Sequence, residues 1–237
     1  MTGDFFRALA RRAARRYRAE DHYARHYAYG NLTRDPFFRH LLQSGLIAPG
    51  ARVLDLGCGQ GVLAALYAAA HERHGVGDWP ADWPAPGARR LRGIDVAERD
   101  IERARSAGGA DAEFTCADIR RADFGAADAV VMLDVLHYVE PAAQDDVLER
   151  ARRALAGGGV LLLRVADASR RGLRLRLTLA ADRLAMRLRG RRVERFHLRA
   201  LAAWQRRLAE SGFRVETRPM SAGTPFANVL LVARTVP

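Results

Sequence analysis

The segment Val53–Gly61 constrains the fold of this chain more than any other part of its sequence. It begins with a short apolar run typical of a buried strand. Glycines then stand at alternate positions, Gly57, Gly59 and Gly61, and apolar residues recur after them at helical spacing. Because glycine has no Cβ, it lets the backbone turn tightly and lets a ligand approach the main chain. The segment therefore predicts a strand, a tight turn and a helix whose first N–H groups are free to bind a ligand.

The spacing within this segment narrows the choice of ligand. The dinucleotide fingerprint is G-x-G-x-x-G, whereas this chain reads Asp-x-Gly-x-Gly-x-Gly, with Asp55 two residues before the first glycine. The positive end of the helix dipole suits an adenosyl cofactor that carries a carboxylate. For a glycine loop taken alone, the alternative is an ordinary strand-to-helix turn.

Further apolar runs alternate with helical patterns along the chain. We expect strands at residues 91–96, 112–117, 127–133, 160–165, 213–218 and 228–233, and helices at 97–107, 141–155 (ended by three glycines at 157–159) and 197–211. This alternation implies parallel βαβ units in one doubly wound α/β sheet. Residues 75–90 interrupt it with Trp79, Trp83 and several prolines, so we expect a surface loop there. The two tryptophans either pack over the edge of the domain or flank a substrate entrance.

All 39 basic residues are arginine, and the formal net charge is +12. Codon bias explains part of this excess; the functional explanation is an anionic partner such as nucleic acid, a membrane surface or an acidic carrier protein. Residues 7–18 hold six arginines and no acid, and the apolar residues around them predict a basic amphipathic helix. That helix either packs on the domain with a solvated arginine face or binds a membrane surface or a partner. Residues 164–199 hold twelve arginines and three acids, with one helical stripe made of Leu173, Leu177, Leu184 and Leu188.

The cysteine count and the hydropathy pattern indicate the compartment. Only Cys58 and Cys116 are present, so the chain has no disulfide framework and fits a reducing compartment. No apolar run approaches the roughly 20 residues of a membrane span, and we find no signal peptide. No cluster of cysteine and histidine suggests a metal site. These features predict a cytoplasmic protein without a metal, and the arginine-rich segments allow it to be peripheral to a membrane.

Acidic residues follow the predicted strands at the ends where ligands bind in parallel α/β sheets. Asp95 ends the second strand, and its carboxylate can accept hydrogen bonds from both hydroxyls of a ribose; a helix N-cap is the alternative. Asp118 follows the third strand and can accept from an adenine amino group while Ile119 covers the ring; a cap or turn acid is the alternative. Leu133 ends the fourth strand. Together these residues predict a nucleoside site better than any one of them does.

Residues 50–165 resemble class I S-adenosylmethionine (SAM) dependent methyltransferases. The resemblance implies a Rossmann-like seven-stranded sheet that ends in an antiparallel hairpin, and SAM as the cofactor. It implies that Asp55 and the glycines line the methionine part of SAM, that Asp95 contacts the ribose and that Asp118 contacts the adenine. The cofactor-binding residues expected on this basis are Asp55, Gly57, Cys58, Gly59, Gly61, Asp95, Val96, Asp118, Ile119 and Leu133.

The resemblance also implies a division of the chain. We expect residues 1–44 to form a helical cap and residues 45–237 to form the methyltransferase domain, with an arginine-rich lid insertion at 169–197. Two short segments, Arg195–Leu198 and Thr224–Asn228, are similar to bacterial methyltransferases of aryl-polyene-type pigment or lipid pathways. The residues expected to wall the acceptor pocket, with simple packing as the alternative, are Tyr23, Tyr27, Tyr29 and Tyr138.

His137 is the candidate catalytic base, because it follows the fourth strand and histidine titrates near neutral pH. A base is needed only if the acceptor loses a proton, and a core histidine is the alternative. The expected reaction moves a methyl group from SAM to a small-molecule, lipid-like or carrier-bound acceptor by in-line displacement. Three other functions stay open: an RNA methyltransferase, favoured by the basic charge; a nicotinamide-dependent oxidoreductase, disfavoured by the glycine spacing; and a non-catalytic SAM-binding protein.

Overall fold

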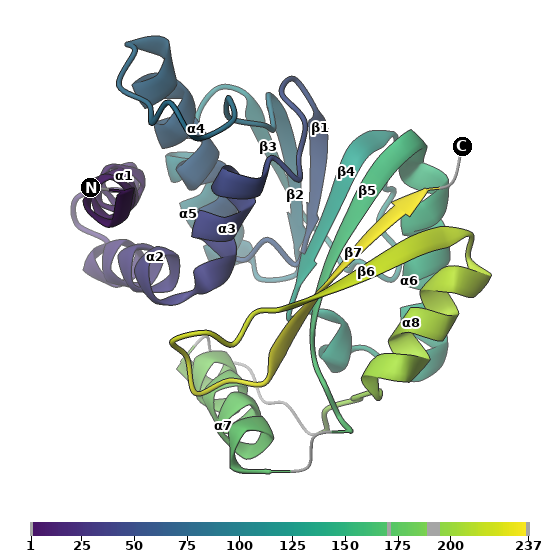
Figure 1. Ribbon diagram of the computed structural model, residues 1–237. Helices are drawn as coiled ribbons and strands as arrows, with labels where there is room; N and C mark the ends of the chain where they lie inside the picture. Colours follow the sequence, from purple (N-terminus) through teal and green to yellow (C-terminus); the bar gives the residue numbers. More distant parts are fainter. Residues whose placement is uncertain (1, 170–171, 189–194, 236–237) are drawn as a thin grey trace. The chain divides into compact units, whose positions relative to one another are not determined.

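The predicted strands form one seven-stranded sheet in the computed structural model, which describes residues 2–169, 172–188 and 195–235 (Figure 1). The strand order is β3-β2-β1-β4-β5-β7-β6, and β7 runs antiparallel to both of its neighbours. The predicted doubly wound α/β fold with a C-terminal antiparallel hairpin is therefore confirmed. The chain divides into two compact units, Met1–Val130 and Val131–Pro237.

The elements of the first unit are α1 (Thr2–Arg15), α2 (His22–Arg34), α3 (Pro36–Ser44), β1 (Arg52–Leu56), α4 (Val62–Gly75), β2 (Arg90–Asp95), α5 (Glu98–Ala107) and β3 (Ala112–Cys116). Strand β4 (Ala127–Leu133) contains the boundary between the units. The elements of the second unit are η1 (Leu136–Tyr138), α6 (Pro141–Ala154), β5 (Leu155–Ala166), α7 (Leu173–Leu188), α8 (Leu201–Glu210), β6 (Phe213–Pro219) and β7 (Asn228–Thr235). Most of these boundaries lie within two residues of those predicted.

Strands β1, β2 and β3 pair in parallel and bring the glycine segment to one edge of the sheet. The N–H groups of Gly57 and Cys58 both donate to the carbonyl of Ile94, at 2.8 and 3.2 Å. These bonds continue the pairing of β1 with β2 beyond the end of β1. They hold the glycine loop beside the end of β2, where Asp95 stands.

Helix α1 packs on its own unit through one apolar face. The side chains buried on that face are Phe6, Leu9, Ala10, Ala13 and Ala14. Arg12 and Arg16 both pair with Glu72 of α4, and Nε of Arg16 also donates to the carbonyl of Ala107 at 2.8 Å. The exposed arginines of α1 lie away from the buried face. The structure therefore supports the first alternative for this basic helix, a packed helix with a solvated arginine face.

The tryptophan-rich loop between α4 and β2 packs against the start of α1. Trp79 and Trp83 each contact the ring of Phe5 edge-on, with centroids 5.6 and 5.5 Å apart. The indole N–H of Trp79 donates to the carbonyl of Pro84 at 3.0 Å. Aromatic rings prefer this edge-to-face arrangement, so the contacts stabilise the loop against the N-terminal helix. The packing role predicted as one alternative for the tryptophans is the one observed.

In the second unit, the three glycines at 157–159 do not end a helix as predicted. Residues 157–159 belong to the start of β5 and do not form a turn after α6. The helix already ends at Ala154, because Leu155 adopts an extended conformation. Gly157 and Gly158 are exposed, Gly159 is buried, and Gly158 has a φ of +77°, so this part of the strand carries no side chain to pack. From Val160 onward the strand pairs with β7 and is buried.

The predicted leucine-rich helix is present as α7, but the last helix begins later than predicted. α8 starts at Leu201 rather than at residue 197, because its N-cap Ala200 is still extended. Before it, the N–H of His197 donates to the carbonyl of His137 (2.8 Å). Within the described residues, no helix is long and apolar enough to cross a bilayer. The predicted lid arginines that lie outside the described residues are Arg170, Arg171, Arg189, Arg191 and Arg192.

Candidate cofactor-binding site

The glycine loop adopts a conformation that needs glycine. Gly57, Gly59 and Gly61 have φ angles of +78°, +53° and +76°, in the left-handed region that L-residues rarely occupy. A Cβ on Gly61 would lie 2.8 Å from the Cβ of Ala104 and 3.2 Å from the ring of Phe114. The third glycine is therefore also required for close packing of α4 against α5, while the first two shape the turn.

Asp95 connects the end of β2 to this loop. One carboxylate oxygen accepts from the N–H of Gly59 and the other accepts from the N–H of Ala97, both at 2.9 Å. Helix α5 has Ala97 as its N-cap, so the alternative that Asp95 caps that helix is wrong. The two hydrogen bonds fix the carboxylate in position. Each oxygen retains a lone pair that can accept from a ligand.

Asp55 is buried beneath the loop. Its own burial and the nearby charge of Asp95 raise the pKa of Asp55 to about 7. The neighbouring thiol of Cys58 is also buried, and burial raises its pKa. A cation bound beside Asp55 would favour the ionised carboxylate, so this end of β1 is suited to a positively charged group.

Asp118 and Ile119 follow β3 and lie next to the end of β2. The N–H of Ala117 donates to the carbonyl of Asp95 at 2.9 Å, which joins the two strand ends. The carboxylate of Asp118 accepts from the backbone N–H of Arg120 at 2.9 Å and pairs with its guanidinium, which lowers the pKa of Asp118. Asp118 thus acts as a turn acid here, as one alternative predicted. Ile119 is buried.

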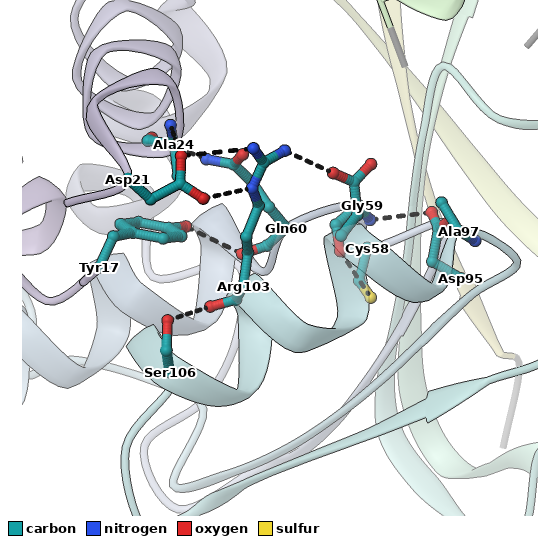
Figure 2. A network of polar contacts seen from close by, with 11 residues as sticks. Tyr17, Asp21, Ala24, Cys58, Gly59, Gln60, Asp95, Ala97, Arg103 and Ser106 are labelled. Carbon is teal, nitrogen blue, oxygen red and sulfur yellow. Dashed lines mark hydrogen bonds and ion pairs between the residues drawn. The ribbon is translucent and has the colours of Figure 1, made fainter. Parts of the chain in front are cut away.

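The loop is also held by residues that sequence reasoning missed (Figure 2). The hydroxyl of the buried Tyr17 donates to the carbonyl of Gln60 at 3.0 Å, and the side-chain amide of Gln60 donates to the carbonyl of Ala24 at 2.8 Å. Arg103 of α5 pairs with Asp21, the N-cap of α2, at 2.7 Å. The sequence feature that could have indicated these contacts is the polar Gln60 within a run of small loop residues. These contacts tie the N-terminal helices to the cofactor loop.

The tyrosines predicted to bind the acceptor lie in different units. Tyr23 and Tyr27 stack on α2 with centroids 6.0 Å apart, and the guanidinium of Arg103 lies 4.8 Å from the ring of Tyr23. Tyr23 is exposed, while Tyr27 and Tyr29 are half-buried. Tyr138 belongs to η1 in the second unit. The structure thus brings the rings of Tyr23 and Tyr27 together, and Tyr29 lies on the same helix.

His137 and the end of β4 both belong to the second unit. The imidazole of His137 is buried between the rings of Tyr138 and Phe196, at 4.2 and 5.3 Å. Burial lowers the pKa of His137 to about 4, although the charge of Asp134 acts in the opposite direction. Asp134 has a φ of +54° and pairs with the buried Arg164. At neutral pH the imidazole is therefore uncharged and can accept a proton only weakly.

The comparison with protein families decides the class of this protein. The model of one family, described as a methyltransferase domain, matches residues 11–218. The chain belongs to this family. It is a SAM-dependent methyltransferase with the Rossmann-like class I fold. A curated relative, carboxy-S-adenosyl-L-methionine synthase from Chromohalobacter salexigens, is 33% identical over 129 residues, which cover 50% of this chain and 43% of that protein. The chain thus matches less than half the length of that relative.

Solved methyltransferase structures share the fold over nearly the whole chain. The N-methyltransferase NodS from Bradyrhizobium japonicum, in complex with S-adenosyl-L-homocysteine (SAH), has a TM-score of 0.59 at 20% identity and covers 98% of each chain. Magnesium protoporphyrin IX methyltransferase from Synechocystis, with bound SAH, has a TM-score of 0.59 at 21% identity and covers 98% of this chain and 97% of its own. At these identities the likeness concerns the fold alone.

Gln144 is another residue that sequence reasoning missed in this methyltransferase. It is fully buried on α6, and its amide nitrogen donates to the carbonyls of Leu136 and Val139 at 2.9 Å and of His197 at 2.8 Å. In the sequence, the only sign of this structural role is a polar residue one turn before Val147, which is buried. Gln144 therefore holds the turn that contains His137 against the segment that precedes α8.

Replacing Gln144 with leucine is expected to lower the free energy of unfolding by about 1–3 kcal/mol, because it removes the hydrogen bonds that this buried amide donates to three backbone carbonyls. Urea denaturation measures this loss. The exposed Gln43 on α3 provides the matched control, and Gln43→Leu should change stability by no more than about 0.5 kcal/mol. Equal effects of the two substitutions would mean that the buried amide contributes nothing.

Proposed function

We propose that this enzyme methylates a small-molecule or lipid-like acceptor and that SAM binds at the carboxyl ends of β1, β2 and β3. The observation that carries the cofactor site is the pair of hydrogen bonds that Asp95 accepts from Gly59 and Ala97. They fix a carboxylate beside a glycine loop while its remaining lone pairs can accept from both hydroxyls of a ribose. The residues present thus fit an adenosyl cofactor.

The other cofactor contacts follow from the same edge of the sheet. In this proposal the carboxylate of Asp55 meets the amino group of SAM, since a cation there would relieve the cost of ionising this buried acid. In this proposal Asp118 contacts the adenine amino group, which requires the exposed Arg120 to give up part of its pairing with this carboxylate. The residues that complete the proposed cofactor site are Gly57, Cys58, Gly59, Gly61, Val96, Ile119 and Leu133.

The proposal for the methyl acceptor rests on the positive charge of the arginine-rich segments and on four tyrosines. Residues 1–44 form the proposed cap over residues 45–237, and the insertion at 169–197 forms the proposed lid. Tyr23, Tyr27, Tyr29 and Tyr138 wall the acceptor pocket in this proposal. The arginine-rich segments favour an acceptor that an acidic carrier protein or an anionic membrane surface presents, as in an aryl-polyene or lipid pathway, so the enzyme would be cytoplasmic and peripheral to a membrane.

Methyl transfer requires little of the protein beyond positioning the cofactor and the acceptor. When bound, SAM supplies a methyl group on a sulfonium, which is a good leaving group. Holding the acceptor in line with that methyl group and excluding water provide much of the rate. A base is required only for an acceptor that loses a proton, and His137 serves this role for a hydroxyl in our proposal.

Replacing His137 with alanine is expected to lower turnover of a hydroxyl acceptor by about 10²–10⁴-fold while leaving SAM affinity unchanged. Because the pKa of His137 is about 4, the wild-type rate should not fall between pH 8 and pH 6 through protonation of this group. Steady-state kinetics over this range measure both. His22→Ala, at an exposed position of α2, is the control. Unchanged turnover of His137→Ala would make His137 a packing residue.

Replacing Asp95 with alanine tests the proposed cofactor site. Loss of the charged acceptor should weaken SAM binding by about 1–3 kcal/mol in titration calorimetry. Asp111→Ala, at an exposed position before β3, removes the same side chain away from the site and should leave the affinity unchanged. If both variants bind SAM like the wild type, the ribose is held elsewhere.

A further inference from the structure

One face of α7 exposes a row of leucines. Leu173, Leu177 and Leu184 expose 69%, 41% and 59% of their surface. Their spacing of four and seven residues places them on the same side of an α-helix. Single exposed leucines are common on protein surfaces, but a row of them along one helix face marks an interaction site.

Arginines border this leucine row. Arg176, Arg183 and Arg187 are exposed on the same side of α7, each within one turn of a leucine of the row. The guanidinium of Arg183 also lies 5.0 Å from the ring of Phe196. The exposed side chains that the structure describes on α7 are leucine, arginine and alanine, so this face is apolar and positively charged.

The opposite face of α7 holds the helix to its own unit. Thr178 is buried, and its hydroxyl accepts from the N–H of Ala227 at 3.1 Å, in the loop between β6 and β7 (Figure 1). Leu175 and Leu179 are half-buried on either side of it. α7 is therefore anchored through one face and presents the leucine row outward.

We propose that α7 docks the enzyme on a membrane surface rich in anionic lipids. An interfacial helix buries its apolar face at the boundary between headgroups and acyl chains, and its basic residues attract anionic lipids. The leucine row fits this role because the arginines stand beside it rather than opposite it. A stable protein interface buries about 800 Å² on each partner, far more than three leucines provide, whereas a lipid surface has no such requirement.

This inference rests on the proposed function in one respect, since docking places the enzyme where a lipid-like acceptor lies. The binding itself does not require methyl transfer and can fail or succeed separately. Cosedimentation of the full-length protein with vesicles tests it. One vesicle type contains equal parts of phosphatidylglycerol and phosphatidylcholine, and the other contains phosphatidylcholine alone.

We expect the wild type to bind the anionic vesicles, to lose most of this binding at high salt and to leave the neutral vesicles unbound. Replacing Arg176, Arg183 and Arg187 together with glutamine should weaken binding roughly 100-fold. Replacing Leu173, Leu177 and Leu184 together with serine should weaken it at least about 10-fold.

A matched control separates docking by α7 from attraction by net charge. Arg206 on α8 and the cross-strand pair Arg214 and Arg234 are exposed arginines of the same unit. Glutamine at these three positions should leave vesicle binding within about two-fold of the wild type. SAH titration of every variant checks that its fold and cofactor site are intact.

The proposal is overturned if the wild type ignores anionic vesicles, or if the control variant loses as much binding as the α7 arginine variant. It is also overturned if α7 binds an acidic acyl carrier protein but no vesicle, since the occupant is then a protein. A wild-type protein that binds vesicles but not SAH would support docking while contradicting the proposed function.

Discussion

The Asp55→Asn variant is expected to be more stable than the wild type at pH 8 and to lose this advantage near pH 4. In the folded protein, burial and the charge of Asp95 raise the pKa of Asp55 to about 7, from 3.8 for the free side chain. The folded state therefore holds a proton between these pH values that the unfolded chain releases. Stability falls as pH rises through this window, by about 4 kcal/mol in total, and then levels off above pH 7.

Asparagine has nearly the same shape as aspartate but carries no charge. The Asp55→Asn variant therefore does not lose stability through this group as pH rises. Urea denaturation of both proteins at steps from pH 4 to pH 8 measures the difference between them, which removes the contribution of all other titrating groups. Asp111→Asn at an exposed position is the control and should follow the wild type at every pH. A wild type and an Asp55→Asn variant that run parallel from pH 4 to pH 8 would contradict a buried, protonated Asp55.

The Gly61→Ala variant is expected to lose about 2–5 kcal/mol of stability. Part of this loss, about 1–2 kcal/mol, comes from placing a Cβ at a φ of +76°. The rest comes from overpacking, because that Cβ would lie 2.8 Å from the Cβ of Ala104. Thermal and urea denaturation measure the total.

Gly77 separates the two contributions. It has almost the same φ, +74°, but a Cβ there would meet no atom within 4 Å. Gly77→Ala should therefore cost only about 1–2 kcal/mol. If the two alanine variants are equally stable, the packing of α4 against α5 at Gly61 is looser than the structure indicates.

Much of the cofactor edge follows from local patterns in the sequence. Asp95 ends β2, as the apolar run before it predicts from periodicity alone. The bond between Asp95 and the N–H of Gly59 follows from parallel strands that end at the same edge of the sheet. The antiparallel hairpin was predictable from the resemblance to known methyltransferases, not from the residues themselves.

Contacts between distant segments were not predictable in the same way. Tyr17 donates to the carbonyl of Gln60, 43 residues away, and no repeat or spacing connects the two positions. The ring of His137 contacts that of Phe196, 59 residues later in the chain, and no local pattern connects these two positions. The glycines at 157–159 looked like a helix stop because glycine favours turns, yet the chain there is already extended.

One titration tests the central claim, that the glycine loop and Asp95 bind the adenosyl cofactor of a methyltransferase. Purified protein is titrated with SAH and, separately, with NAD in a calorimeter. We predict saturable SAH binding at one site per chain and no binding of NAD, because the glycine spacing differs from the dinucleotide fingerprint. Tight NAD binding without any SAH signal would contradict the account.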